Sequence, residues 1–292
     1  MKTLIDVLVA GLLLGGTYAL VAVGLNLVFG VVRVINFAHG ELVMLGMYGG
    51  YVAHVLGFDP YFSVLVVAPL MFLLGVVIQR LLIQPLQGEP LMQVFTTFGL
   101  LLLLQNLVLA VTGGEAVSIE IDRYSRPIHV FGTSVGIPRL VVLAVATLTT
   151  IGLREYLNRS MTGRAIRAVV QDRNAARLMG INVERIYMLV FGLAAAMAGV
   201  AGVLLGPSYS ATPYIGGDFI FAAFAVVTLG GLGSIPGAYI GAMIVGVVEV
   251  LSGFYIEPSL RQAVWFALFI LVLIVRPTGL LGAKGAAELG VR

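Results

Sequence analysis

The stretch REYLNRSMTGRAIRAVVQDRNAARLMGINVER, residues 154–185, is the most informative part of this chain. It holds seven of the chain's 17 Lys and Arg residues and only three acidic residues. The seven are Arg154, Arg159, Arg164, Arg167, Arg173, Arg177 and Arg185. The sequence on both sides is strongly apolar, and residues 186–260 contain no Lys or Arg. Because basic residues near the ends of membrane spans resist translocation, the loop 159–185 is predicted to lie in the cytoplasm.

The composition predicts a membrane protein. The chain is 60% hydrophobic and 11% charged, with a mean hydropathy of +1.05, whereas an average soluble domain has about 25% charged residues. A water-soluble core cannot absorb so much apolar surface in 292 residues, but a bilayer can solvate it. The net charge of +3 is small, so nucleic acid is not an expected partner. With no cysteine, the chain can form neither disulfides nor thiolate metal sites.

Hydropathy predicts about nine spans, each near the ~20 residues that cross ~30 Å of hydrocarbon. They cover residues 5–29, 39–57, 61–83, 92–112, 138–158, 186–206, 218–232, 236–255 and 260–281. Residues 218–232 are short for a span, which suggests a broken or re-entrant helix. The expected fold class is an all-α integral membrane protein: a polytopic helical bundle of about 8–9 segments with broken helices and pseudo-repeat halves. We expect one domain over residues 1–292.

Counting spans outward from the basic loop predicts the topology. The C-terminus, with Lys284 and Arg292, falls inside, and the segment 113–137 falls outside. The N-terminus falls outside if every segment crosses. An acid, Asp6, lies in its charged region and no small-residue cleavage site follows. The N-terminal stretch is therefore expected to be the first span and not a removable signal peptide.

The outer segment 113–137 is mixed in character. The alternation of residue types from Val117 to Ile121 predicts a short strand. The charged and titratable residues of the segment are Glu115, Glu120, Asp122, Arg123, Arg126 and His129. Two interpretations stay open: a solvated connection, or a docking surface for an external partner.

Two Gly-bounded segments, 29–41 and 229–237, resemble each other, and each precedes an apolar helix. A shift of 197 residues superposes Gly40 on Gly237 and Gly49 on Gly246. By the topology above, both segments lie at the same membrane face. The pattern suggests parallel repeats, as some transporters use, with plain helix packing as the alternative for each glycine.

The first of these segments gathers Asn36, His39 and Glu41 within six residues. Polar groups at membrane depth are costly and usually face a cavity, a partner helix or a pathway. The alternative is a cytoplasmic turn in which Asn36 or His39 caps the following helix, with Glu41 at its positive end. One His and one Glu are too few for a metal site. No catalytic triad, zinc-protease motif or phosphate-binding Gly-Lys-Ser/Thr pattern occurs in the chain, so we do not expect an enzyme.

The basic loop predicts two short helices. In the first, Arg164, Arg167 and Gln171 share one face, and the opposite, apolar face comprises Ile166, Val169 and Val170.

For the second helix, Asp172 is the expected N-cap and Gly180 the expected left-handed stop. Two short helices make a compact unit that can enter a groove on another protein, or an amphipathic segment that lies on anionic lipid. In the first case Ala175 and Ala176 permit close approach, and Arg173 and Arg177 can pair with carboxylates of the partner.

Four passages resemble the permeases of ATP-binding-cassette importers for branched-chain amino acids, the LivH/LivM permease family. Ala175-Ala176 followed by Gly180-Ile181 is similar to the coupling-loop motif of such permeases. The passages are 34–41 (VINFAHGE), 162–165 (TGRA) through Gly180-Ile181-Asn182, 229–238 (LGGLGSIPGA) and 276–282 (RPTGLLG). The resemblance implies a multi-pass subunit of the inner or plasma membrane. Its implied partners are a second, LivM-type permease subunit, two cytoplasmic ATPase subunits and an extracytoplasmic substrate-binding protein.

The resemblance and the residues together predict two sets of functional residues. The set expected to couple the chain to the ATPase comprises Arg164, Arg167, Asp172, Arg173, Ala175, Ala176, Arg177 and Gly180. The set expected along the substrate pathway comprises Asn26, Asn36, His39, Thr228, Gly230, Gly231, Gly233 and Ser234. Without a phosphate-binding loop the chain needs no cofactor of its own, and ATP is expected on the partner subunits.

The expected mechanism is alternating access driven by ATP binding and hydrolysis on those partners. Two alternatives stay open. The first is a permease of the same family for urea or short amides. The second is an ion-coupled secondary carrier, for which Glu249 and Glu41 are the ionisable residues to consider. A membrane-embedded enzyme is not expected, because it would need a clustered acid, base or metal set in the spans, which this sequence lacks.

Overall fold

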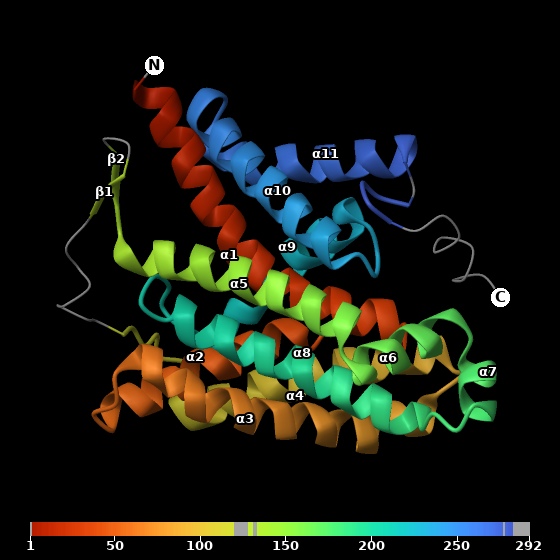
Figure 1. The fold of residues 1–292 in the computed structure, drawn as a ribbon. Helices are drawn as coiled ribbons and strands as arrows, with labels where there is room; N and C mark the ends of the chain where they lie inside the picture. Colours follow the sequence, from red (N-terminus) through yellow and green to blue (C-terminus); the bar gives the residue numbers. More distant parts are fainter. Residues whose placement is uncertain (1, 120–127, 131–132, 277, 283–292) are drawn as a thin grey trace.

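The computed structural model describes residues 2–119, 128–130, 133–276 and 278–282, and these residues are almost entirely helical (Figure 1). The helices of the first half are α1 (Lys2–Val32), α2 (His39–Val55), α3 (Pro60–Ile78), the short η1 (Gln79–Ile83) and η2 (Gln84–Leu86), and α4 (Pro90–Thr112). Those of the second half are α5 (Ile137–Arg159), α6 (Met161–Gln171), α7 (Arg173–Leu178), α8 (Val183–Leu205), α9 (Ile215–Gly230), α10 (Ile235–Tyr255), η4 (Pro258–Leu260) and α11 (Arg261–Val275). Between the halves lies an antiparallel hairpin of two short strands, β1 (Ile128–Val130) and β2 (Thr133–Val135).

Seven helical segments of the described residues are long and apolar enough to cross a membrane. They are Leu4–Val32, Pro60–Leu86, Pro90–Thr112, Ile137–Arg159, Val183–Leu205, Ile235–Tyr255 and Pro258–Val275. The two remaining predicted spans, 39–57 and 218–232, are the helices α2 and α9, with 17 and 16 residues. The expectation of a polytopic all-α membrane protein is confirmed, and the chain is a multi-pass membrane protein.

The core is formed by α1 and α8, the two most buried of the seven spans. Glycines let their neighbours approach closely. A Cβ on Gly15 of α1 would lie 2.8 Å from the Cα of Met243 in α10, and one on Gly46 of α2 would lie 2.8 Å from the Cα of Gly199 in α8. Small residues at such crossings are typical of helices that associate in lipid, where van der Waals packing replaces the hydrophobic effect.

The direction of α1 defines two ends of the molecule. Near its start, Asp6 accepts a hydrogen bond from the Thr133 hydroxyl of β2. At its other end, Arg33 donates to the Val170 carbonyl of α6 over 3.1 Å. We call these the hairpin end and the α6–α7 end.

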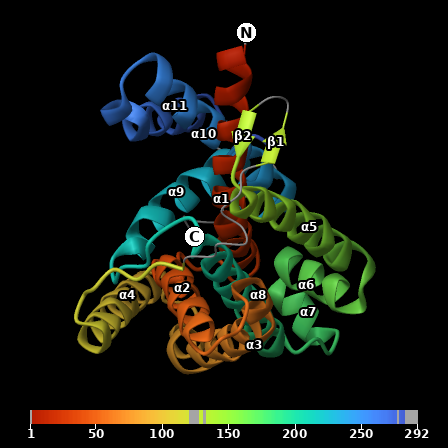
Figure 2. The same cartoon turned by 90° about the vertical axis from the view of Figure 1, so that its left-hand side faces the viewer.

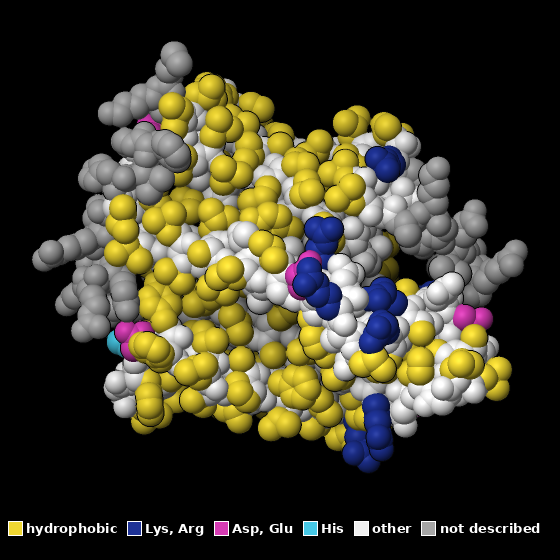
Figure 3. Space-filling view, viewed as in Figure 1, with side chains coloured by type: hydrophobic (Ala, Val, Ile, Leu, Met, Phe, Trp, Pro, Cys, Tyr) yellow, Lys and Arg dark blue, Asp and Glu magenta, His cyan; other side chains and the backbone are white. Residues whose placement is uncertain are grey.

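Arginines are unequally divided between the two ends. Those of the described residues at the α6–α7 end are Arg33, Arg80, Arg154, Arg159, Arg164, Arg167, Arg173, Arg177, Arg185 and Arg276, whereas the hairpin end has Arg139 and Arg261. Figure 3 shows the same asymmetry on one face: Lys and Arg side chains gather toward α6 and α7, and hydrophobic side chains dominate the rest. The distribution is that expected of a membrane protein with one basic face.

The helices α2 and α9 begin inside the bundle and do not cross it completely. His39, the first residue of α2, is fully buried, and its Nε2 lies 3.2 Å from the Val21 carbonyl oxygen of α1. Val21 is 11 residues before the end of α1, or about 16 Å along the helix at 1.5 Å per residue. The backbone of Gly40 touches that of Gly216 in the first turn of α9.

From this meeting point the two helices run to opposite ends. Beyond its midpoint α2 contacts the hairpin-end connection, where the Tyr48 hydroxyl lies 3.5 Å from the Ala211 carbonyl oxygen. In contrast, α9 ends beside Leu280 at the α6–α7 end. A short helix was expected at 218–232, but the prediction of a complete span at 39–57 was wrong. Hydropathy cannot detect that residues 33–38 return into the bundle before α2 begins, because those residues are themselves mostly apolar.

The outer connection is only partly described. Val117 forms an isolated antiparallel bridge with Ala211, so the predicted strand is realised there at one residue. The rest of its prediction, through Glu120 and Ile121, falls outside the described residues, as do Asp122, Arg123 and Arg126. The strands that do form are β1 and β2, which the sequence did not indicate.

Candidate functional sites at the basic loop and the helix breaks

The helix α6 is amphipathic and is packed onto the end of α5. Its N-cap, Ser160, accepts a hydrogen bond from the Gly163 amide at 2.8 Å. Arg164, Arg167 and Gln171 are exposed, whereas Ile166 and Val169 are buried and Val170 is half-buried. The predicted division of the helix into a polar and an apolar face is confirmed. The apolar face joins the main hydrophobic core, which fixes α6 to the membrane-spanning part.

The second short helix, α7, begins and ends where the sequence predicted. Asp172 is the N-cap, and its Oδ1 accepts from the amides of Asn174 and Ala175 at 2.8 and 2.9 Å. After the helix Gly180 has φ +82°, and its amide donates to the Arg177 carbonyl over 3.0 Å. Both ends of α7 are therefore closed by specific local interactions.

The arginines of this unit also bind within the chain. Arg173 donates to Gln87 Oε1 at 2.5 Å, and its guanidinium carbon lies 5.8 Å from the centre of the Tyr187 ring. Arg177 forms an ion pair with Glu184 of α8. These contacts connect α7 to the segment before α4 and to the start of α8.

Arg167 donates to the Leu157 carbonyl at the end of α5. Of the two predicted small residues, Ala175 is exposed and Ala176 is buried. Ala176 therefore packs under α7 in this structure, and Ala175 is the one that a partner can reach.

The tip of α7 exposes two large apolar side chains that the sequence analysis missed. Leu178 is 89% exposed and Met179 is 82% exposed, directly before Gly180. Exposed apolar residues on a polar loop are a typical feature of protein interaction sites. The signal in the sequence is the apolar pair itself, which directly precedes the predicted helix stop at Gly180 within an otherwise polar loop.

Five of the predicted pathway residues form a tight structural clamp at the α6–α7 end. Asn26 of α1 donates to the Ser234 carbonyl at 2.7 Å and accepts from the Gly233 amide at 2.8 Å. Ser234 in turn caps α10 by accepting from the Gly237 amide at 3.2 Å. Gly30 faces Gly233 so closely that a Cβ on Gly30 would lie 2.6 Å from the Gly233 Cα.

The rest of the clamp joins the end of α9 to the closing segment of the chain. The amides of Leu280 and Leu281 donate to the carbonyls of Leu229 and Gly230 at 2.8 and 2.9 Å. Gly231 has φ +108° and lies against Gly282. The passages 229–238 and 276–282, which are far apart in the sequence, therefore meet at one place.

Thr228, the remaining predicted pathway residue of α9, joins the clamp only through its backbone: a Cβ on Gly279 would lie 2.5 Å from the Thr228 carbonyl oxygen. It is half-buried, and its hydroxyl donates to the Phe224 carbonyl of its own helix at 2.8 Å.

The start of α2 holds a buried polar group of a different kind. Asn36, His39 and Glu41 are each no more than 1% exposed. Glu41 Oε1 accepts from Gln105 of α4 at 3.0 Å, but its Oε2, both amide atoms of Asn36 and His39 Nδ1 have no hydrogen-bond partner among the described residues. The prediction that Asn36 or His39 caps α2 was wrong, because the N-cap is Ala38 and no side chain caps the helix. The ring of His39 instead lies within hydrogen-bonding distance of the Val21 carbonyl oxygen.

Helix α4 borders this group. The Thr97 hydroxyl donates to the Ile35 carbonyl at 3.0 Å. The ring centroid of Phe37 lies 6.2 Å from that of Phe98 in α4 and 5.2 Å from that of Phe224 in α9. Three side chains of α4, at Thr97, Phe98 and Gln105, thus contact the start of α2 and the segment before it.

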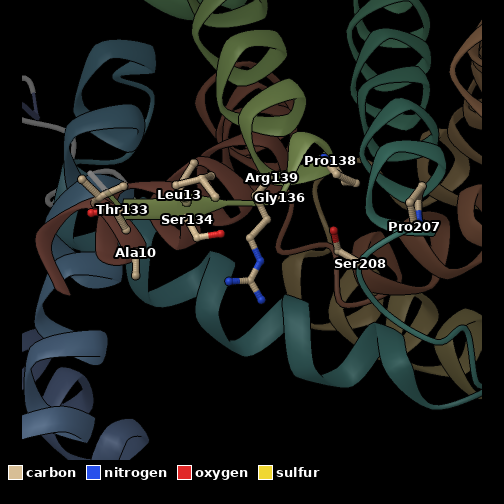
Figure 4. A pocket seen from close by; sticks show the side chains of 11 residues that line it. Ala10, Leu13, Thr133, Ser134, Gly136, Pro138, Arg139, Pro207 and Ser208 are labelled. Carbon is tan, nitrogen blue, oxygen red and sulfur yellow. The ribbon is translucent and has the colours of Figure 1, made fainter. Parts of the chain in front are cut away.

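A cavity of about 370 Å³ opens at the hairpin end, between the start of α1, β2, the start of α5 and the connection after α8. Figure 4 shows the guanidinium of Arg139 in its centre, with Ser134 and Ser208 at its sides. Arg139 has no hydrogen bond or ion pair within the described part of the chain. No group of three or more metal-ligating side chains occurs among the residues that the structure describes.

Comparison with known proteins identifies the family. The profile of the family described as "Branched-chain amino acid transport system / permease component" matches residues 7–273. The chain is 37% identical to the high-affinity branched-chain amino acid transport system permease protein LivH of Escherichia coli, over 93% of each chain. It is 36% identical to the corresponding permease protein BraD of Pseudomonas aeruginosa, over 94% of each.

A weaker similarity extends to a second permease of the same named system. The chain is 29% identical to LivM of Escherichia coli, over 90% of this chain and 67% of LivM. No solved structure matches the chain. The profile covers most of the chain and the identities extend over nearly its full length. This chain therefore belongs to the permease-component family of branched-chain amino acid transport systems.

Proposed function

We propose that this chain is one of two homologous permease subunits of an ATP-driven importer, and that it carries branched-chain amino acids across the cell membrane by alternating access. The observation that carries the proposal is the α6–α7 unit. It is capped at Ser160, Asp172 and Gly180, fixed to the core on one side, and apolar at its exposed tip. Such a unit can receive a force from another protein and pass it to the membrane helices.

The partners follow from what the chain lacks and what it is similar to. It has no phosphate-binding loop, so ATP must be bound and hydrolysed elsewhere, on two cytoplasmic ATPase subunits. Similarity to both LivH and LivM supports pairing with a second, LivM-type permease. A substrate-binding protein on the outer side would deliver the amino acid.

The arginine distribution supports an orientation. We place the α6–α7 end in the cytoplasm and the hairpin end outside, because the α6–α7 end carries most of the described arginines. In this orientation the exposed tip of α7 faces the ATPases, and the cavity at Arg139 faces the binding protein.

The contacts of the α6–α7 unit suggest how a displacement of α7 is transmitted to the membrane helices. Arg33 ties α6 to the end of α1, Arg173 ties α7 to the segment before α4, and Arg177 ties it to α8. A displacement of α7 would therefore reach three spans at once. One of them, α4, contacts the buried polar group at the start of α2 through Gln105. The predicted pathway residues Asn36 and His39 belong to that group.

The proposal is tested at the tip of α7. Leu178→Glu places a charge at an apolar position that makes no core contact, so folding should be unaffected while docking to an ATPase is lost. Gln171→Glu is the matched control, because Gln171 is exposed on the same loop but on the polar face of α6. Leucine uptake and copurification of the ATPase are measured for both variants after expression with the partner subunits.

We expect Leu178→Glu to reduce both uptake and ATPase copurification by at least about tenfold, because the variant would place an unpaired carboxylate in an apolar contact, which costs about 2 kcal/mol or more. Gln171→Glu should keep both near the wild-type values. Normal uptake in Leu178→Glu would refute the assignment of this unit as the docking site.

A further inference from the structure

One exposed carboxylate lies on an otherwise apolar helix inside the bundle. Asp218 belongs to the first turn of α9, two residues after Gly216, whose backbone meets Gly40 at the start of α2. Its side chain is exposed and forms no hydrogen bond or ion pair with the described residues. By its contacts with α2 this first turn lies near the level of Val21, well within the length of α1.

Asp218 is part of an exposed stripe on the first two turns of α9. Successive residues of a helix are rotated by about 100°, so positions seven apart lie nearly above one another. Tyr214 and Phe221 follow this spacing and are each 59% exposed, and Asp218 lies between them on the same side of the helix. Gly217 lies between them, and no heavy atom is found within 4 Å of where its Cβ would be.

The surroundings of α9 leave this stripe uncovered by the rest of the chain. The other side of the helix packs on α1, α2 and α10, with Ala222, Ala223 and Val226 buried. Figure 2, viewed from the hairpin end, shows α9 on one flank of the molecule, with α11 above it and α4 below it, while α5 and α6 occupy the opposite flank.

The charge of Asp218 indicates whether the stripe faces lipid or a polar environment. A carboxylate facing hydrocarbon is costly, so charged residues at this depth face water, a ligand or a partner. Glu41, on the neighbouring α2, is buried and bound by Gln105, and so cannot meet a ligand in this state. Asp218 is the accessible carboxylate of the two.

We propose that the α9 stripe lines the route of the amino acid between the two permease subunits, and that Asp218 receives its ammonium group. The inference rests on the proposed function for the substrate class. The chemistry of the stripe fits a branched-chain amino acid: a carboxylate for the positive end, with open space beside Gly217, and the rings of Phe221 and Phe224 for the aliphatic side chain.

Cysteine accessibility tests the position of the stripe. The chain has no cysteine, so single cysteines report without background from this subunit. Asp218→Cys and Phe221→Cys are made in the complex with its partner subunits and treated with the membrane-impermeant cation 2-(trimethylammonium)ethyl methanethiosulfonate. Ala222→Cys, the next residue but on the buried face, and Leu73→Cys, exposed on α3, are the matched controls.

We expect rapid modification of Asp218→Cys and Phe221→Cys and no modification of the two controls. Leucine supplied with the binding protein should slow the modification of Phe221→Cys several-fold, because this variant keeps the Asp218 carboxylate. A stripe that faces lipid or is covered by the second permease would leave Asp218→Cys as unreactive as Leu73→Cys, which would overturn the inference.

Transport tests the role of the charge. Asp218→Asn keeps the shape and removes the charge, and should reduce leucine uptake at least about tenfold, the loss expected when one charge-assisted hydrogen bond is weakened. ATPase copurification should be unchanged. Wild-type uptake in Asp218→Asn would overturn the ammonium assignment, whatever the labelling. Failure of the proposed function is distinguishable, because the wild-type complex would then show no ATP-dependent leucine uptake.

Discussion

At the scale of single residues, Asn26 shows how a polar side chain at membrane depth can serve the structure. Its amide binds the Ser234 carbonyl and the Gly233 amide, and so holds the turn between α9 and α10 against α1. A direct contact between Asn26 and substrate would require that turn to open. The sequence predicts that Asn26, Gly233 and Ser234 share one functional role. It does not show that Asn26 binds the other two, which are more than 200 residues away in the chain.

Removal of this clamp should destabilise the protein. Asn26→Leu has nearly the same volume but removes two hydrogen bonds from a half-exposed turn, so we expect a loss of about 1–3 kcal/mol in stability. Thermal unfolding of the purified protein in detergent measures it. Asn106→Leu is the control, because Asn106 binds only the Leu102 carbonyl of its own exposed helix. Equal melting temperatures for the two variants would contradict the clamp.

The contact between Gly30 and Gly233 makes a second prediction at this scale. Gly30→Ala should destabilise by about 1–3 kcal/mol, because its Cβ would come within 2.6 Å of the Gly233 Cα and force the turn away from α1. Gly99→Ala, in α4, meets nothing within 4 Å and should be neutral or slightly stabilising, since alanine favours helix. The melting temperatures of the two variants, measured in the same detergent, test whether the close approach of Gly30 to Gly233 stabilises the protein. A Gly30→Ala protein as stable as Gly99→Ala would show that the close approach is not required.

At the scale of elements, the short helices of the basic loop were predicted well and the membrane helices less well. Asp172 and Gly180 act through local rules, which depend only on the adjoining residues, so the sequence identifies α7 almost to the residue. The start of α2 depends on the contact of His39 with Val21, 18 residues earlier, and on the meeting of Gly40 with Gly216. Hydropathy carries no information on such contacts, and it therefore predicted a complete span.

The helix α7 gives the element-scale prediction. Gly180→Pro fixes φ near −65°, whereas the structure requires +82°, and it removes the amide that donates to Arg177. We expect membrane insertion to be unchanged and leucine uptake to fall to background. Gly88→Ala is the control for a left-handed glycine, since Gly88 has φ +97° in a neighbouring loop with no atom within 4 Å of its Cβ position. Uptake by Gly180→Pro equal to that of Gly88→Ala would contradict a mechanical role for α7.

The double charge reversal of Arg173 and Arg177 is a less specific probe of the same element. Those side chains bind Gln87 and Glu184 within the chain, so their reversal would loosen α7 from its neighbours as well as change its surface. Loss of transport in that variant would support a role for α7 but would not separate docking from rigidity. The Leu178→Glu variant makes that separation.

At the scale of the whole molecule, the part of the chain that the structure describes combines seven apolar spans with two helices that begin at mid-depth and run to opposite ends. The number of apolar segments, the basic loop and the membrane class could be read from the sequence. Two other features could not be read from the sequence, because they depend on how the helices pack. One is the convergence of the passages 229–238 and 276–282 near Asn26 and Gly30, and the other is the exposure of Asp218. The parallel repeat predicted from Gly40 and Gly237 stays a prediction.

The most direct test of the central claim is uptake of labelled leucine by proteoliposomes that contain this chain with its partner subunits and binding protein, and that hold ATP on the α6–α7 side. An ATP-driven permease predicts uptake that requires ATP hydrolysis and persists when an ionophore collapses the ion gradients. Uptake that continues without ATP and stops with the ionophore would instead show an ion-coupled carrier, and would contradict the account.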